Sequence, residues 1–245
     1  MEHFKRQIAA KAGLFFVAAL VFLAGCAQEE PSKTLTAKST ESGGKAVSME
    51  MAPGAKPAAE EVPMPSTAPI TEERSYYDFE RGDLAGWEVP QWAQGKTDYV
   101  AKSAEVSDAF ASKGSHSMKV AADFPGGYWT AALVEIQQYL DLSKYRVISV
   151  DIYLPADAPA GLNAKMILTV GDNWRFVEMN RSFPLMPGEW VTVTASMEPG
   201  SYDWKRTVPD EKFAEDVRKI AIRIESNMKP KYTGDIFIDN VRVGR

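Results

Sequence analysis

The chain has 245 residues and a formal net charge of −5, with its basic residues scattered along the sequence. This charge argues against nucleic acid as a partner, because phosphate binding needs a basic surface. The only cysteine is Cys26, so no disulfide can form within the chain and a folded part must be stable by its core alone.

Residues 1–25 are predicted to be a secretory signal, because three basic residues precede an apolar run and small residues follow it. The signal ends at Leu23-Ala24-Gly25-Cys26, which resembles a bacterial lipobox. The resemblance implies cleavage before Cys26 and acylation of that residue, so the mature chain is expected in the cell envelope, held to a membrane by acyl chains. Residue 27 is Ala, and in a Gram-negative cell this resembles the pattern sorted to the outer membrane. The alternative is a retained membrane helix, for which the apolar run is short, since a span needs about 20 residues.

Residues 26–74 are predicted to be a lipidated cysteine followed by a disordered linker. From Ala27 to Arg74 there is no aromatic residue, and Pro, Ala, Ser, Thr, Glu and Lys dominate. Such a segment buries too little apolar area to offset chain entropy. A flexible linker of this length has an end-to-end distance of roughly 35–40 Å. The linker therefore either holds the folded part away from the lipid surface or is a spacer without a selected role.

Residues 75–245 are predicted to be one all-β domain, which contains all six Trp and all nine Tyr. Apolar and polar residues alternate in several segments separated by Pro and Gly turns, as is typical of half-buried strands. These segments are residues 118–124, 146–154, 166–170, 191–195, 219–225 and 235–243. A short helical stretch is expected at residues 210–218. Alternating strands without long helices predict two antiparallel sheets packed face to face, a β-sandwich of jelly-roll type.

Five short motifs occur in order along this domain. They are Asp78-Phe79-Glu80 with Gly82 and Trp87, then the segments 114–120, 140–145, 188–193 and 238–241. Together they resemble the galactose-binding-like jelly rolls that serve as carbohydrate-binding modules. The resemblance implies a jelly roll and sugar binding, and it also places Trp87 and Trp190 in the core. Because proteins with this fold have several different functions, the function of this chain must be inferred from its site residues and not from the fold.

Catalysis has little support in the sequence. His3 and His116 are the only histidines, and neither stands in a nucleophilic or zinc-binding pattern. A glycosidase needs two carboxyl groups at a set separation in a deep cleft, which a lone sandwich rarely provides. We therefore expect a protein that is not an enzyme, with a glycoside hydrolase as the weakest alternative.

Sugar rings have apolar faces and hydroxyl rims, so a binding surface needs aromatic rings together with charged or amide groups. Such residues occupy the strand positions opposite the core and two loops. The candidate carbohydrate-binding residues are Asp151, Tyr153, Trp174, Arg175, Arg223, Glu225, Trp129 and Trp204. They form one face if their strands are neighbours. The alternative is a solvated face with salt bridges, with the Trp residues closing the ends of the sandwich.

The resemblance also implies a structural calcium ion. The matching positions are Glu80, Asp239 and the carbonyl of Lys113, with Asp78 nearby. Calcium prefers six or more oxygen ligands. The alternative is that Glu80 and Asp239 accept hydrogen bonds from backbone amides alone.

The sequence therefore predicts a membrane-anchored, non-catalytic lipoprotein that binds a polysaccharide or glycan through a β-sandwich face. A protein-interaction or scaffold lipoprotein of the same fold is the alternative. A hollowed row of exposed rings favours sugar, whereas a flat apolar patch favours a protein partner.

Overall fold

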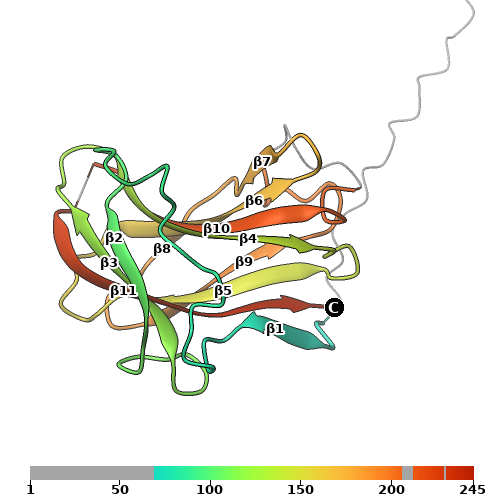
Figure 1. The fold of residues 1–245 in the computed structure, drawn as a ribbon, viewed down its shortest axis with the longest axis horizontal. Helices are drawn as coiled ribbons and strands as arrows, with labels where there is room; N and C mark the ends of the chain where they lie inside the picture. Colours follow the sequence, from blue (N-terminus) through green and yellow to red (C-terminus); the bar gives the residue numbers. More distant parts are fainter. Residues whose placement is uncertain (1–68, 206–211, 229) are drawn as a thin grey trace, which may run out of the picture. The chain divides into compact units, whose positions relative to one another are not determined.

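The computed structural model describes residues 69–205, 212–228 and 230–245, which form two antiparallel sheets packed face to face (Figure 1). Sheet A contains, in spatial order, β2 (Ala101–Ser107), β3 (Ser117–Phe124), β11 (Tyr232–Gly244), β5 (Val147–Tyr153) and β9 (Trp190–Ser196), with β1 (Glu73–Tyr77) also paired to β11. Sheet B contains β4 (Thr130–Leu140), β10 (Val217–Ser226), β6 (Leu162–Val170) and β7 (Arg175–Glu178), with β8 (Phe183–Pro184) also paired to β6. The predicted antiparallel β-sandwich is confirmed.

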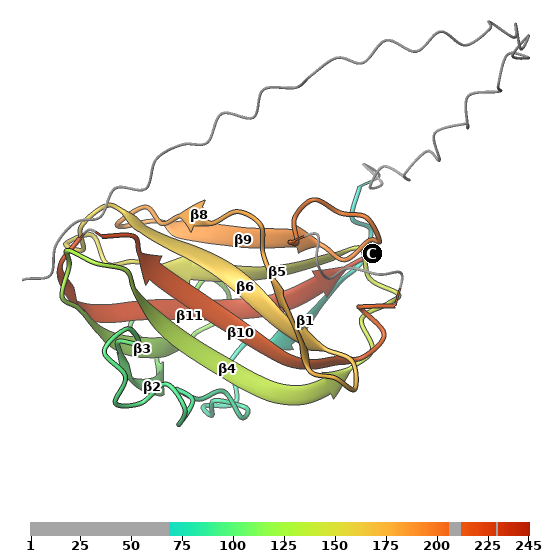
Figure 2. The same cartoon turned by 90° about the horizontal axis from the view of Figure 1, so that it is seen from above.

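The alternation read from the sequence decides which side chains enter the core. On β10, Ile220, Ile222 and Ile224 are buried between the sheets, whereas Lys219 and Arg223 point outward. Because successive side chains of a strand point to opposite faces, a register slip by one residue would bury the charges and expose the isoleucines. The pairing of β10 with β4 and β6 is therefore strongly specified, and these strands lie side by side in Figure 2.

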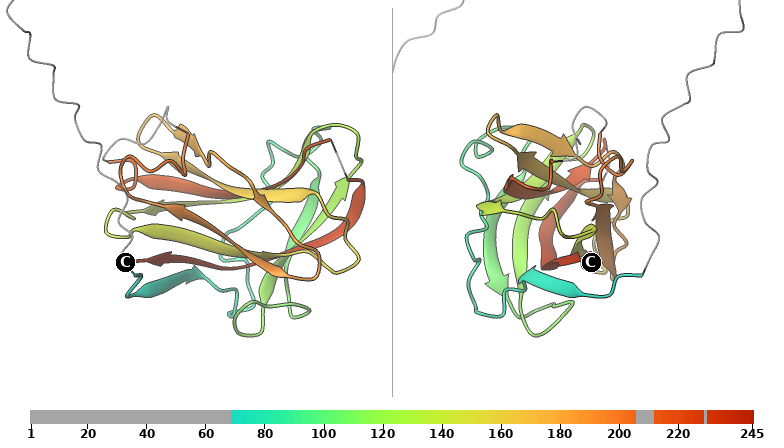
Figure 3. Two further views of the ribbon diagram at one scale, coloured as in Figure 1. Left: turned by 180° about the vertical axis from the view of Figure 1, so that it is seen from behind. Right: turned by 90° about the vertical axis from the view of Figure 1, so that its right-hand side faces the viewer.

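The core lies between the sheets and includes Trp87, which is buried as expected. The ring of Tyr77, at the end of β1, meets Trp87 edge to face with the centroids 5.5 Å apart. The first strand is thereby joined to the core as well as to β11 (Figure 3).

Three local expectations need correction. The folded part begins before residue 75, because β1 starts at Glu73 and the Thr71 amide donates to the Arg245 carbonyl over 2.8 Å. The described part of the expected helix at 210–218 consists of turns followed by the start of β10, and the Ala214 carbonyl accepts a hydrogen bond from Leu142. Trp190 is half-buried on the outward face of sheet A, where it packs against Tyr153, and is not a core residue.

The signal at 1–25, Cys26 and most of the predicted linker lie outside the described residues. Within the described ranges, no helix has the length and apolar character that a membrane crossing requires.

Candidate functional site

The outward face of sheet B places charged, aromatic and apolar side chains in register. Lys219 of β10 lies opposite Gln137 of β4 and Thr169 of β6. Two residues further along β10, Ala221 lies between Glu135 and Ile167. Because adjacent strands are about 4.8 Å apart, side chains of three strands meet across this face.

A cleft of about 280 Å³ is hollowed into this face, and we name it the sheet B cleft. Its lining residues are Trp92, Tyr99, Leu133, Glu135, Ile167, Thr169, Trp174, Phe176, Lys219, Ala221 and Arg223. The floor is apolar, because Leu133, Ile167 and Ala221 form a small buried cluster of their own outside the main core. Burial of apolar side chains on the outward face of a sheet leaves a dry floor for a ligand.

One wall of the cleft is the irregular segment that runs along the free edge of β4. The amide of Glu88 donates to the Glu135 carbonyl over 3.0 Å, and the Glu135 amide returns the bond over 2.9 Å. The segment carries Trp92, which is 44% exposed, and Tyr99, whose ring meets the indole edge to face at 5.0 Å. The ammonium group of Lys96 lies 5.0 Å from the Trp92 ring. This wall therefore presents the indole of Trp92 to the cleft, and Tyr99 and Lys96 hold it in place.

The other wall comes from β7 and the turn before it. It carries Phe176 and Trp174, both exposed, with Trp174 42% exposed. The Arg218 guanidinium lies 5.5 Å from the Trp174 ring and 5.4 Å from the Tyr139 ring, and Asp216 pairs with it at 2.8 Å. A cation held over an aromatic ring restrains both groups, so Trp174 is positioned before any ligand arrives.

Ion pairs between neighbouring strands border the floor. The Lys219 ammonium binds the Glu135 carboxylate at 2.7 Å, and the Trp92 indole N–H lies 3.4 Å from the same carboxylate. Charges held in this way present fixed donors and acceptors to a ligand in the cleft.

A denser ionic network continues from the cleft along β10 and β6. The Glu178 carboxylate accepts hydrogen bonds from Lys165 at 3.0 Å, Lys205 at 2.6 Å and Arg223. The Glu225 carboxylate lies 3.2 Å from Arg223 and 3.6 Å from Lys165. Burial alone would raise the pKa of Glu178, but the hydrogen bonds from Lys205 and Lys165 and the charge of Arg223 outweigh it and lower the pKa to about 2.

Arg223 connects this network to the cleft and retains one unused donor. Its Nη2 group is engaged by the two carboxylates, and its guanidinium lies 5.7 Å from the half-buried Trp129 ring. Among the described residues, no acceptor lies within hydrogen-bond distance of its buried Nε–H group. A buried donor without a partner is energetically costly.

The structure brings four of the predicted binding residues together at this face. Trp174 and Arg223 line the cleft, and Glu225 and Trp129 contact Arg223 beside it. Arg175 is not among the lining residues, because Phe176 is the β7 residue that faces the cleft.

Three other predicted residues lie elsewhere. Asp151 and Tyr153 belong to β5 in sheet A, so the prediction that they share a face with Arg223 is wrong. Asp151 is buried and already accepts hydrogen bonds from Thr192 at 2.7 Å and Arg242 at 2.9 Å. Trp204 is 0% exposed and therefore cannot stack on a ligand.

Among the aromatic and charged lining residues, five were not predicted from the sequence: Trp92, Tyr99, Glu135, Phe176 and Lys219. Lys219 could have been predicted, because it lies two positions from Ala221 and four from Arg223 on the same alternating strand and so shares their face. The irregular segment that carries Trp92 and Tyr99 has no periodicity from which its position could be read.

The predicted calcium residues surround the loop between β2 and β3. Asp239 is 0% exposed, and one carboxylate oxygen accepts the amides of Ser112 at 2.8 Å and Lys113 at 3.1 Å. Glu80 accepts the Ser115 and His116 amides, each at 2.8 Å.

The fourth calcium candidate, Asp78, accepts the Glu80 amide at 3.3 Å. Within the part of the chain that the structure describes, no three His, Cys, Asp or Glu side chains are grouped to hold a metal ion. Calcium binding through the Lys113 carbonyl, Glu80 and Asp239 stays a prediction.

Comparison with known proteins gives one family and a set of similar folds. Residues 77–240 match the family described as mannanase, galactose-binding domain-like. The carbohydrate-binding module CBM27-1 of Caldicellulosiruptor saccharolyticus, solved with mannohexaose, aligns with a TM-score of 0.50 and 17% identity over 70% of this chain and 96% of that chain. A CBM28 module specific for non-crystalline cellulose aligns with a TM-score of 0.50 and 18% identity over 68% of this chain and 92% of that chain. No curated protein matches the chain. The two structures share the β-sandwich fold.

Proposed function

The chain belongs to the mannanase galactose-binding-like family, and from this premise we propose that its sheet B cleft binds a polysaccharide. The observation that carries the proposal is the pairing of aromatic walls with an apolar floor and fixed charges. Trp92 stands on one side and Trp174 and Phe176 stand on the other, above a floor bordered by the Glu135–Lys219 pair. Rings can stack on the C–H faces of sugars while the charged groups bond the hydroxyls.

This arrangement favours a sugar over a protein partner. The exposed rings line the two sides of a hollow, with charged groups beside the floor, and do not form one flat apolar patch. A protein interface core is instead depleted of charged residues.

We propose mannan as the first ligand to test, because the family is described by mannanase and the similar CBM27-1 was solved with mannohexaose. The cleft volume lies near the lower end of typical ligand sites, which fits a short stretch of a glycan chain.

A binding role without hydrolysis is also proposed. Glycoside hydrolysis needs a carboxylic acid that still carries its proton near neutral pH. Glu178 has the opposite character, because its cationic partners lower its pKa to about 2. Anchoring through Cys26 completes the proposal and places the binding domain at a membrane of the cell envelope.

Isothermal titration with mannohexaose tests the cleft. We expect Trp92→Ala and Trp174→Ala each to weaken binding about fivefold, as loss of one aromatic contact predicts. Tyr128→Ala removes an exposed ring outside the cleft and serves as the matched control. Thermal melts establish that each variant is folded.

Two outcomes would contradict the proposal. If both Trp variants bind mannohexaose as the wild type does, the sheet B cleft is not the binding site. If the wild type binds neither mannan nor cellulose at millimolar sugar, a protein partner becomes the better explanation.

A further inference from the structure

A second group of aromatic rings lies on the outward face of sheet A. Phe110 stacks on Tyr153 with the centroids 4.6 Å apart, and it contacts Phe237 at 4.9 Å. Tyr153 also packs against Trp190 at 5.4 Å. These rings lie outside the core between the sheets, and Phe110 is 39% exposed.

The loop that carries Phe110 is fixed at several points. Asp239 accepts the Ser112 amide, Glu80 accepts the Ser115 and His116 amides, and the Ser117 hydroxyl donates to the Phe110 carbonyl over 2.6 Å. Carboxylates that hold a loop by its amides restrict its conformations, here the buried Asp239 and the exposed Glu80. Phe110 is therefore held in place over sheet A before any ligand binds.

A cavity of about 410 Å³ opens beside this ring, and we name it the Phe110 pocket. The residues that define it here are Phe110, Lys119, Asp157, Thr233, Asp235 and Phe237. Its volume lies within the usual range for small-molecule sites. The pocket therefore combines an exposed ring with two carboxylates, one ammonium group and the hydroxyls of Ser107, Tyr232 and Thr233.

The polar groups of the pocket lie close together. The Lys119 ammonium lies 4.0 Å from the Asp235 carboxylate and is held at 2.6 Å by Glu105, and the Thr233 hydroxyl donates to Asp123 over 2.6 Å; Glu105 and Asp123 lie outside the lining. Burial raises the pKa of Tyr232 to about 12, and the charges of Asp157 and Asp235 add to the rise. Both carboxylates thus act on one tyrosine that lines the pocket.

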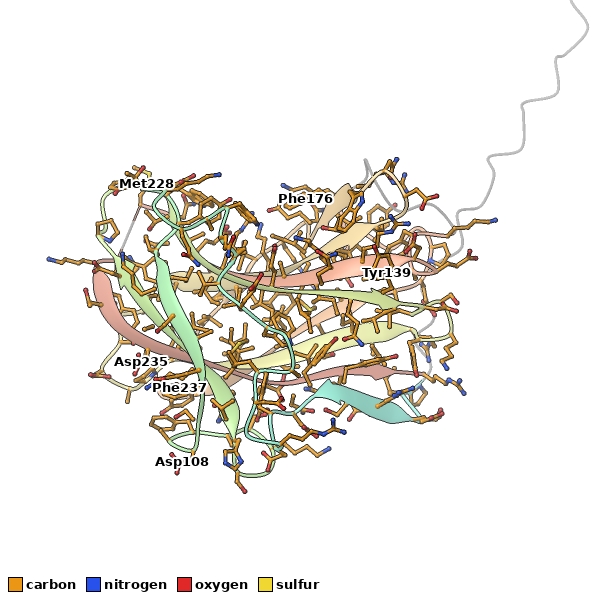
Figure 4. The ribbon with its side chains drawn as sticks, in the orientation of Figure 1. Asp108, Tyr139, Phe176, Met228, Asp235 and Phe237 are labelled. Carbon is orange, nitrogen blue, oxygen red and sulfur yellow. The ribbon has the colours of Figure 1, made fainter. Side chains whose placement is uncertain are left out.

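The Phe110 pocket is separate from the sheet B cleft. Figure 4 places Asp235 and Phe237 apart from Phe176 and Tyr139, and the two groups of residues belong to different sheets. The two sites have no lining residue in common.

We propose that the Phe110 pocket is a second carbohydrate-binding site, which takes a single neutral sugar ring at a chain end or branch. Phe110 stacks on the apolar face of the ring, while Asp157 and Asp235 accept hydroxyl hydrogens and Lys119 donates to a hydroxyl oxygen. A protein partner would be expected to bury a broad surface, whereas this site is a local hollow with charged groups at its lining. The inference does not depend on ligand binding at the sheet B cleft.

Nuclear magnetic resonance of the ¹⁵N-labelled protein tests the proposal, with D-mannose, D-galactose and D-glucose as separate probes at millimolar concentration. At least one monosaccharide is expected to shift the amide signals of residues 233–237. Phe110→Ala is expected to weaken that response about fivefold, and Asp235→Asn is expected to weaken it as well. Tyr128→Ala, which removes an exposed ring outside both sites, should leave the response unchanged.

The outcomes separate the two sites. No shift at residues 233–237 with any of the three sugars, while mannohexaose shifts the signals of Phe176 and Ala221, would overturn the second site and leave the cleft intact. A shift at residues 233–237 that persists fully in both folded variants would also overturn it. Shifts at residues 233–237 without any response at the cleft would support the pocket and contradict the proposed function of the cleft.

Discussion

The ionic network beside the cleft gives a quantitative prediction for Glu178→Gln. This carboxylate contacts Lys165, Lys205 and Arg223, and its pKa is lowered from 4.5 to about 2. A shift of roughly 2.5 units corresponds to about 3 kcal/mol of folding stability, since each unit is worth about 1.4 kcal/mol. The Gln variant loses the charge that holds the three cations together, so we expect it to be about 2–3 kcal/mol less stable at pH 7.

The sign of the pH dependence follows from the lowered pKa. The stabilisation by Glu178 is fully present above the unfolded pKa near 4.5 and disappears as the pH falls toward 2. The wild type should therefore lose stability over this interval, and the difference between wild type and variant should shrink over the same interval.

Thermal and urea melts at pH 7, 5, 3.5 and 2.5 measure this difference. At pH 7 the melting temperature of the variant should be lower by roughly 4–12 °C, since about 1 kcal/mol corresponds to about 2–4 °C in a domain of this size. Glu189→Gln changes an exposed glutamate in the turn before β9 and should have little effect at any pH. If the Glu178→Gln variant is as stable as the wild type at pH 7, or if the gap stays constant down to pH 2.5, the coupling of these charges to folding is refuted.

Three further predictions concern other parts of the chain. Trp204→Ala should destabilise the domain by about 3–5 kcal/mol, because the indole is fully buried, and urea melts that show no loss would contradict this burial. Cys26→Ala should release the protein from membranes, as measured by fractionation and fatty-acid labelling, and labelling of the variant would refute acylation at this position. Calcium should raise the melting temperature of metal-stripped protein and excess chelator should reverse the rise, because the hydrogen bonds to the fully buried Asp239 carboxylate from the described residues come from neutral N–H and O–H donors. An unchanged melting temperature would contradict calcium binding and would mean that the N–H and O–H donors alone hold the carboxylate.

The faces of individual strands were predictable from the sequence, but the sheet to which each strand belongs was not. Alternation correctly separated Ile222 from Arg223 on β10 and Ile152 from Tyr153 on β5. It carries no information on which strands are neighbours, because pairing depends on contacts distant in the chain. The residues predicted to form one binding face therefore lie on two different sheets, with Asp151 on sheet A and Arg223 on sheet B.

Loop aromatics were the other source of error. Trp204 was expected to border a binding face, yet its indole N–H donates to the Ser196 carbonyl over 2.6 Å and its ring packs against Phe213. Trp92 is the converse case, since it lies in a loop and is exposed at the cleft. Whether a loop tryptophan is buried depends on contacts with segments distant in the chain, which the local sequence does not reveal. Trp87 is buried although its N–H group has no hydrogen-bond partner among the described residues.

The pairing of β1 with β11 determines how the domain bears mechanical load. A pull on the N-terminal side of the domain first meets the hydrogen bond from the Thr71 amide to the Arg245 carbonyl, and then the first residue pair of the strand, Glu73 opposite Gly244. The strand has only five residues, and Tyr77 fastens its inner end by contacts with Trp87 and Gln138. If the domain binds a glycan while its N-terminal side is tethered to a membrane, as proposed, we expect tension to open the β1–β11 pairs one after another before it reaches β4, β10 and β6 of sheet B.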